Sequence, residues 1–243
     1  MRDYLLDLVS HTYDLGCIDT VKITGDDTTT QIESLAEDRS VVISGAFRAP
    51  VAEFIGLFGM PNLDKLKILL NLQVYRENAD ITVTKQSRNG QDVPVGLKFV
   101  NEGKDFHNDY RFMTSEIVQE KLKTPKFLGS TWDIEFEPSV ASIQRLKMQS
   151  QANSDMAVFR VIADGTGLKF AFGDHSTHAG EFVFDSAVTN KLKQVWSFPV
   201  AQVISILNLA GDRTMRISNN GAMQITVDSG LATYNYILPA QSK

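Results

Sequence analysis

Two histidines, His175 and His178, stand three residues apart in the segment GDHSTHAGE, and two imidazoles at this spacing can bind a metal ion. No cysteine accompanies them, and the composition is that of a hairpin loop, so a solvated turn is the simpler interpretation. The single cysteine, Cys17, begins a predicted strand and has no histidine beside it. This setting is typical of a small buried residue rather than of a catalytic thiol. A lone thiol cannot form an intrachain disulfide, which fits a reducing cytoplasm.

Two further patterns could serve catalysis. Asp164-Gly165-Thr166-Gly167 resembles a phosphate-binding loop, but it lacks the Gly-Lys-Ser/Thr ending and joins two predicted strands. Asp133, Glu135 and Glu137 alternate along one predicted strand and could act as acid and base. A solvated strand face explains the three carboxylates equally well, and no second cluster accompanies them. Because no nucleophile, base and orienting group come together, we expect no enzymatic activity, no metal and no cofactor.

The composition is that of an ordinary globular protein with one large domain or two smaller ones. Of 243 residues, 43% are apolar and 22% are charged. The start, MRDYLLDLVSHTYDLG, lacks the features of a signal peptide, and no window is apolar enough to span a membrane. The net charge of −5 argues against a protein that coats nucleic acid with its whole surface, but it allows a local basic patch.

In the first half, apolar spacing predicts a helix over 2–14 that stops at Gly16. We expect Pro50 to open a short helix over 51–58, with Gly59 ending it. Asn89-Gly90 is a hairpin signal between two strands. The predicted strands of this half are 17–24, 28–36, 40–47, 67–77, 80–86, 93–100 and 106–113.

In the second half, Ser139 should cap a helix that runs to about Gln151. A proline-opened helix over 199–209 precedes a closing meander with turns at 219–221 and 229–230. The helix that Ser139 caps should bury Val140, Ile143 and Leu146. It should expose Gln144, Lys147, Met148 and Gln151. The predicted strands are 132–137, 156–163, 168–172, 181–185, 194–198, 214–218, 223–228 and 232–238.

Each half therefore has the order helix, three or more strands, short proline-started helix, meander. The letters PVAEFIGLF at 50–58 and PVAQVISIL at 199–207 also match in part. Between 114 and 131 the periodicity is lost, and lysines, a proline and a glycine accumulate. We predict an α+β fold with two similar domains, residues 1–115 and 132–243, joined by a connector over 116–131.

This doubled order of elements resembles the DNA sliding-clamp family. In that family each domain packs β-sheets on two helices, and three two-domain subunits close into a six-domain ring. The ending Tyr234-Asn235-Tyr236-Ile237-Leu238-Pro239-Ala240 is similar to the aromatic–aliphatic–proline ending of the eukaryotic trimeric clamp. The length and the acidic, divergent sequence look most like the clamps of tailed bacteriophages.

The resemblance implies a homotrimeric ring that encircles double-stranded DNA without sequence preference. Its partners would be a replicative DNA polymerase, held for processive synthesis, and a clamp loader, all in the cytoplasm of a bacterial host. No membrane partner is expected. A phage structural protein of the baseplate type, with repeated β domains that form rings, is the alternative. A monomeric processivity factor with a basic face is a third interpretation, which the net charge disfavours.

The resemblance also implies three sets of site residues. Residues facing DNA would be Gln144, Lys147 and Gln151, with Arg2, Arg145, Lys191, Lys193 and Arg213 in flanking positions. A pocket for a short apolar-aromatic partner peptide would be formed by Leu35, Phe127, Leu128, Tyr236, Ile237, Leu238 and Pro239. The subunit interface would join strand 106–112 of one copy to strand 181–185 of the next, through Phe106, Tyr110, Phe112, Glu181, Val183 and Asp185. Solvated surface charge is the alternative for each basic residue, and core packing is the alternative for the pocket residues.

Overall fold

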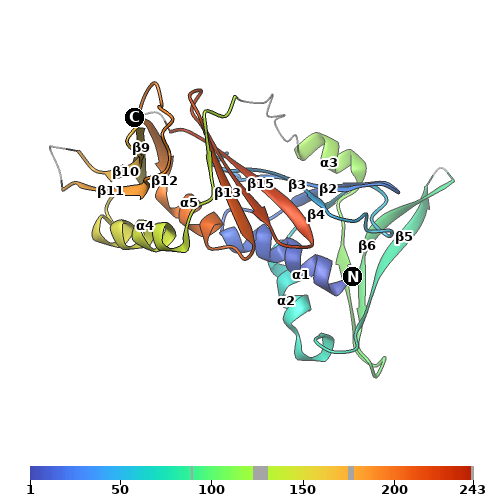
Figure 1. Cartoon of the computed structure of the whole chain (residues 1–243). Helices are drawn as coiled ribbons and strands as arrows, with labels where there is room; N and C mark the ends of the chain where they lie inside the picture. The colour runs from blue at the N-terminus through green and yellow to red at the C-terminus, as the bar shows by residue number, and fades with distance from the viewer. Residues whose placement is uncertain (89, 123–130, 175–177, 242–243) are drawn as a thin grey trace. The chain divides into compact units, whose positions relative to one another are not determined.

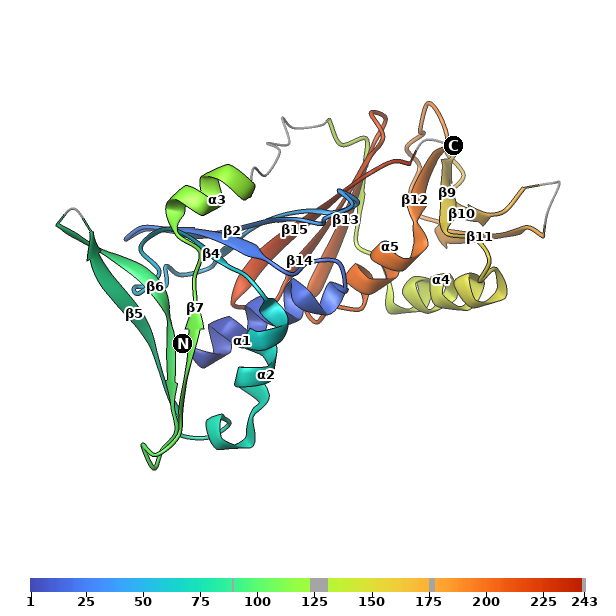
Figure 2. The same ribbon diagram turned by 180° about the vertical axis from the view of Figure 1, so that it is seen from behind.

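The structure, a computed structural model, describes residues 1–88, 90–122, 131–174 and 178–241. The chain forms two compact units (Figure 1, and from behind Figure 2). The first comprises Met1–Pro125 with Ser229–Tyr234, and the second comprises Lys126–Asp228 with Asn235–Lys243. The strand near the end of the chain is thus divided between the two units.

The first unit begins with a helix and contains two sets of antiparallel strands. Its elements are α1 (Arg2–His11), η1 (Tyr13–Leu15), β1 (Val21–Gly25), β2 (Thr30–Leu35), β3 (Val42–Phe47), β4 (Gly56–Met60), α2 (Leu63–Asn71), η2 (Gln73–Tyr75), β5 (Asp80–Arg88), β6 (Gln91–Val100), β7 (His107–Arg111) and α3 (Ser115–Lys121). Strands β4-β1-β2-β3 are antiparallel neighbours in that order, and β5-β6-β7 form a separate antiparallel sheet. Helices α1 and α2 pack on each other.

The second unit repeats this plan. Its elements are β8 (Ile134–Phe136), α4 (Val140–Ala152), β9 (Val158–Ala163), β10 (Leu168–Phe172), β11 (Gly180–Asp185), β12 (Trp196–Pro199), α5 (Val200–Leu207), β13 (Asp212–Ser218), β14 (Ala222–Asp228) and, except for its residues 232–234, β15 (Ala232–Pro239). Helix α4 packs along β11 and β10, as Figure 1 shows.

The two sets of elements have the same connectivity. The order β4-β1-β2-β3 in the first set corresponds to β12-β9-β10-β11 in the second, and β5-β6-β7 corresponds to β13-β14-β15. Helices α1 and α2 occupy the same places in the chain order as α4 and α5. The predicted α+β fold with two similar sets of strands and two helices each is confirmed.

The helix predicted after Pro50 is wrong. Only a turn forms there, closed by the bond from the Phe54 N–H to the Val51 carbonyl (2.8 Å), and β4 follows. Val51, Phe54 and Phe58 are all buried. Apolar residues at this spacing can be buried by a turn and a strand as well as by a helix. β1 also approaches so closely that a Cβ on Gly25 would lie 1.7 Å from the Phe54 carbonyl oxygen.

The first unit's second helix is instead α2, which overlaps the first part of the stretch predicted as strand 67–77. It begins just after Pro61 and buries Leu63, Leu66 and Leu70, which are three and four residues apart. The hydroxyl of Tyr110 on β7 donates a hydrogen bond to the Pro61 carbonyl at this corner. The equivalent prolines of the repeat are therefore Pro61, which follows β4, and Pro199, which ends β12, and each just precedes the start of a helix.

The predicted connector is partly helical. α3 occupies its first part, with Val118 buried, while residues 123–130 lie outside the described residues. The hairpin predicted at Asn89-Gly90 connects paired strands, since Arg88 faces Gln91, although Asn89 itself lies outside the described residues.

Candidate functional site

Helix α4 presents the face that was predicted to meet DNA. Ser139 caps it as predicted, because its hydroxyl oxygen accepts a hydrogen bond from the Ser142 N–H (3.0 Å). Ile143 and Leu146 are buried as predicted. Val140, predicted to be buried, is 72% exposed because it lies in the first turn on the outward side.

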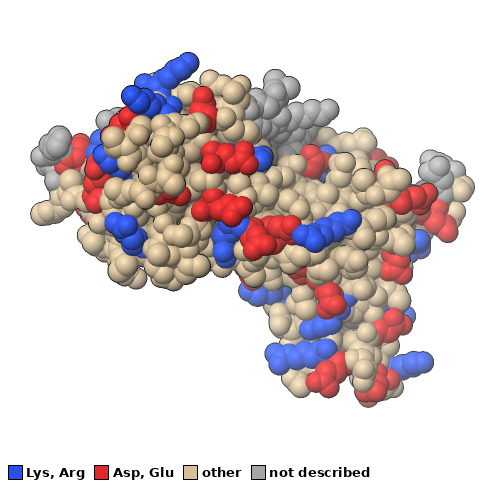
Figure 3. All heavy atoms as spheres, viewed as in Figure 1, with Lys and Arg blue, Asp and Glu red and all other residues tan. Residues whose placement is uncertain are grey.

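The outward face of α4 is largely uncharged. Gln144 and Gln151 are exposed and Lys147 is half-buried, so the three residues share one face at helical spacing. Met148, 59% exposed, lies on the same side. In Figure 3 the surface over α4 is mainly neutral, and on the rest of that view acidic and basic side chains are interspersed.

The flanking basic residues are held in different ways. Arg145 lies over the ring of Phe182, 5.4 Å from its centroid, and so points away from the Lys147 side. The guanidinium of Arg213 donates to the Leu209 carbonyl. Lys191 and Lys193 are exposed, whereas Arg2 is half-buried, with one guanidinium nitrogen that has no hydrogen-bond partner within the described residues.

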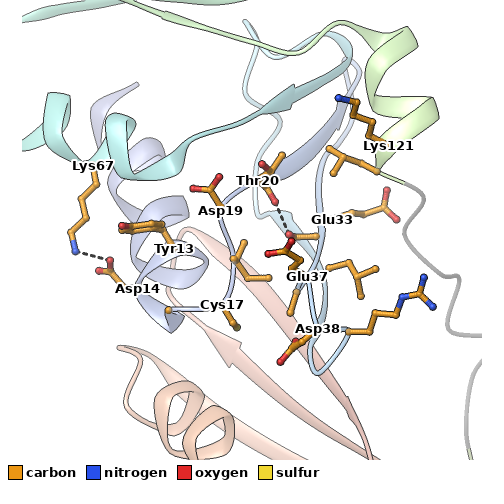
Figure 4. Close-up of a pocket in the computed structure, with 17 residues that line it drawn as sticks. Tyr13, Asp14, Cys17, Asp19, Thr20, Glu33, Glu37, Asp38, Lys67 and Lys121 are labelled. Carbon is orange, nitrogen blue, oxygen red and sulfur yellow. Dashed lines mark hydrogen bonds and ion pairs between the residues drawn. The ribbon is translucent and has the colours of Figure 1, made fainter.

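Two lysines on α2 were missed because this helix was predicted elsewhere. Lys65 is exposed, and the Lys67 Nζ pairs with Asp14 Oδ1 at 2.8 Å while lying 5.6 Å from the centroid of the Tyr13 ring (Figure 4). The hydrogen bond that Lys67 donates to the Asp14 carboxylate raises the pKa of Lys67. The leucine spacing after Pro61 was the signal that could have identified both lysines.

A cleft of about 1290 Å³ lies within the first unit (Figure 4). Its walls are η1 with the segment 16–20 that follows it, the end of strand β2 with the turn after it, and the end of α3. Burial, followed by the negative charge of Asp38, raises the pKa of the Cys17 thiol, which makes this lining cysteine a poor nucleophile. The described lining residues are Tyr13, Asp14, Gly16, Cys17, Ile18, Asp19, Thr20, Glu33, Ser34, Leu35, Ala36, Glu37, Asp38, Arg39, Lys67, Lys121 and Leu122.

The residues predicted to form a partner-peptide pocket differ in exposure. Leu35 is half-buried and lines the cleft, and Pro239 is exposed. Tyr236 and Leu238 are fully buried and Ile237 is 7% exposed, so core packing accounts for these three side chains. Phe127 and Leu128 lie outside the described residues.

The two strands predicted to join subunits are both edge strands. β7 ends the β5-β6-β7 sheet, and β11 ends the set β12-β9-β10-β11. Half of the backbone hydrogen-bonding groups of an edge strand point away from its neighbour. The side chains predicted at this interface divide by exposure: Phe106 and Glu181 are exposed, Val183 and Asp185 are half-buried, and Tyr110 and Phe112 are buried.

The patterns first considered for catalysis have structural roles. Asp164 closes the turn between β9 and β10 by accepting hydrogen bonds from the Thr166 hydroxyl (2.6 Å) and N–H (2.9 Å). Asp133 accepts from the Asn219 N–H (2.7 Å), and Glu135 pairs with Arg216 (3.0 Å). His178 is exposed, and His175 lies outside the described residues. Within the described ranges, no three side chains of metal-binding type come together.

The doubled arrangement of strands and helices is that of a sliding-clamp fold, as two solved structures show. The first is A. fulgidus PCNA with the bound C-terminal region of FEN-1, with a TM-score of 0.67 and 10% identity over 100% of this chain and 95% of that one. The second is PCNA from Thermococcus kodakaraensis, with a TM-score of 0.67 and 12% identity over 99% of this chain and 97% of that one. No family model and no curated protein sequence matches the chain.

At these identities the similarity establishes the fold, which is the PCNA-like clamp fold. It does so over the whole chain, including both copies of the repeat. Among the described helices, none is long and apolar enough to cross a membrane.

Proposed function

We propose that this protein is a DNA sliding clamp, in which a homotrimeric ring encircles duplex DNA and tethers a replicative polymerase. The observation that carries the proposal is the repeated order of strands and helices, matched from end to end by PCNA structures. The proposal includes two clamp domains, 1–115 and 132–243, a connector over 116–131, and a tailed-phage origin with action in the host cytoplasm.

The helix faces fit a protein that must stay on DNA without holding one sequence. On α4 only Lys147 is positively charged within the face that also carries Gln144 and Gln151. On α2 Lys65 is exposed, whereas Lys67 is paired with Asp14. Electrostatic attraction to phosphates grows with the number of cations, so contacts this sparse would permit sliding. Retention would then depend on ring closure.

The partners proposed are the polymerase and a clamp loader, which would dock through short apolar-aromatic peptides. Leu35 and Pro239 have exposed surface for such contacts, and Phe127 and Leu128 belong to the same proposed pocket. An aromatic side chain suits such a site because its burial supplies binding energy while the peptide backbone stays at the edge.

The test combines mass and activity. Light scattering should give three times the subunit mass of 27.0 kDa, and the protein should lengthen the products of its cognate polymerase when a loader is present. A monomer at every concentration, without effect on product length, would refute the clamp.

A phage structural ring protein remains the second candidate, because the repeated domains with unpaired edges also suit assembly into rings. It predicts a stable ring that leaves polymerase product length unchanged. Mass and product length measured on the same preparation therefore distinguish the two functions.

A further inference from the structure

The strand β5 forms one edge of the sheet β5-β6-β7. It pairs with β6 from Asp80 to Arg88, and among the described residues no strand pairs with its other side. Figures 1 and 2 both show this outer side of β5 without a strand beside it. The outward backbone N–H and C=O groups of an edge strand are a template on which another strand can pair.

The corresponding edge of the second unit is covered. There β8 pairs antiparallel with β13, where Phe136 faces Met215 and Ile134 faces Ile217. The two β13 residues are fully buried. The repeat therefore shows within this chain how such an edge is completed: by a short antiparallel strand with apolar residues at alternate positions.

The hairpins give the equivalent positions on β5. Each hairpin begins with an aspartate that faces the last residue of the next strand, Asp80 in β5 and Asp212 in β13. Counting from the aspartate, Val83 takes the place of Met215, and the residue two positions further on is Lys85. Val83 is only half-buried and Lys85 is exposed, so the positions that β8 covers in the second unit are uncovered here.

We propose that the outer edge of β5 binds an extended segment of a partner protein, which pairs antiparallel with β5 and adds a fourth strand to the sheet. This inference goes beyond the clamp function and does not depend on the ring. Facing residues of an antiparallel pair lie on the same side of the sheet. The partner segment should therefore carry an apolar residue that packs on Val83. Main-chain hydrogen bonds would supply affinity, and the side chains would supply specificity.

Lys85 determines the charge of the partner segment. It takes part in no ion pair within the described part of the chain, and it lies on the same side of β5 as Val83. A lysine on an edge strand disfavours pairing with an apolar strand, whereas a facing carboxylate would form a cross-strand ion pair. Because the partner runs antiparallel, its acidic residue comes two positions before its apolar residue.

The same charge argues against a second copy of β5 as the partner. Two β5 strands that pair antiparallel about a twofold axis place residues of one side opposite residues of the same side. The side that carries Lys85 also carries Ile81, Val83 and Ser87, and none of these is acidic. Lys85 would then face an apolar residue, a serine or another lysine.

A synthetic peptide, Thr-Glu-Thr-Phe-Thr-Val-Thr with both ends blocked, tests the proposal. In the proposed pairing its Glu faces Lys85, its Phe faces Val83 and its Val faces Ile81. The control peptide has the Glu and the Phe exchanged. The first peptide should shift the amide NMR signals of β5 and should bind at least about tenfold more tightly than the control. No shift at about 1 mM peptide, or equal affinity of the two peptides, would overturn the proposal.

Backbone methylation shows whether the peptide binds as a strand. Alternate amides of a strand point toward its neighbour in the sheet. N-methylation of one alternate set of peptide amides should therefore abolish binding, and N-methylation of the other set should preserve it. If both methylated peptides bind equally, strand addition is wrong.

A charge exchange tests the contact with Lys85. Lys85→Glu should weaken binding of the first peptide at least about tenfold, and a peptide with Lys in place of Glu should recover most of the loss. Lys98→Glu is the matched control, because Lys98 is an exposed lysine of β6 that faces Thr82 and so lies on the other side of the sheet. It should leave binding unchanged. An equal loss in both variants would show that only net charge matters and would overturn the proposed pairing.

Discussion

Tyr234 donates a hydrogen bond from its hydroxyl to Oδ2 of Asp7 over 2.8 Å, and its ring stacks on His11 with centroids 4.8 Å apart. The contact lies in the first unit, to which Ser229–Tyr234 belong. Nearby, the Arg48 N–H donates to the Leu231 carbonyl (2.8 Å). A segment from the end of the chain therefore completes the unit that the first helix begins.

Removal of this hydroxyl should destabilise the protein. Tyr234→Phe should lower the free energy of unfolding by about 1–3 kcal/mol, because it removes a donor from a largely buried carboxylate. Urea denaturation measures the change. Tyr4→Phe is the matched control, since the Tyr4 ring packs on Phe47 and its hydroxyl makes no hydrogen bond to any residue that the structure describes. An equal loss in both variants would contradict the role of the bond.

Asp7 should contribute to stability at neutral pH and lose that contribution in acid. Burial alone raises the pKa of Asp7, but hydrogen bonds from His11, Tyr234 and Ser229 outweigh it and hold the pKa below the ordinary value. A carboxyl with a lowered folded-state pKa stabilises the fold above its unfolded pKa of about 3.9, and the effect disappears as pH falls through the folded value. Unfolding free energies at pH 6 and pH 3 should therefore differ less in Asp7→Asn than in wild type.

The α4 face should control how DNA binding responds to salt. Lys147→Ala should reduce the slope of log affinity against log salt by about 1, and Gln144→Arg should increase it. Lys85→Ala, an exposed lysine on β5, serves as the control and should leave the slope unchanged. Equal slopes in all variants would show that α4 does not face DNA.

Release of Lys67 from Asp14 should strengthen DNA binding if α2 lines the ring. Asp14→Asn removes a negative charge and frees the lysine, so affinity at low salt should rise. The gain should vanish when Lys67→Met is added. Because exposed ion pairs contribute less than about 1 kcal/mol, the melting temperature should change little. A gain that persists without Lys67 would show that only the net charge matters.

Leu238→Ala should lower the stability of the fold, and any loss of partner binding should follow from that destabilisation. Its side chain is fully buried, so truncation should cost about 2–5 kcal/mol of stability. Pro239→Glu changes an exposed residue beside it and should weaken binding of an apolar-aromatic polymerase peptide, measured by fluorescence anisotropy, without loss of stability. Unchanged peptide binding would remove Pro239 from the pocket.

Most of the strands and α4 could be predicted from sequence, because alternation and the Ser139 cap are local signals. The misplaced second helix had a tertiary cause: the spacing of Val51, Phe54 and Phe58 fits a helix, but contact with β1 holds the segment as a turn and strand. Because of that error, Lys65 and Lys67 were not among the residues predicted to face DNA. Tyr236 and Leu238 show a further limit, since apolar letters do not distinguish a core residue from one that lines a pocket.

The divided strand β15 has a consequence for synthesis on the ribosome. Residues 229–234 pack in the first unit, yet they are translated only after nearly all of the second. Until they emerge, the first helix has no Tyr234 to bind Asp7, and Arg48, the residue after β3, has no Leu231 carbonyl to bind. We therefore expect the nascent first unit to remain loosely folded and sensitive to protease until translation is almost complete.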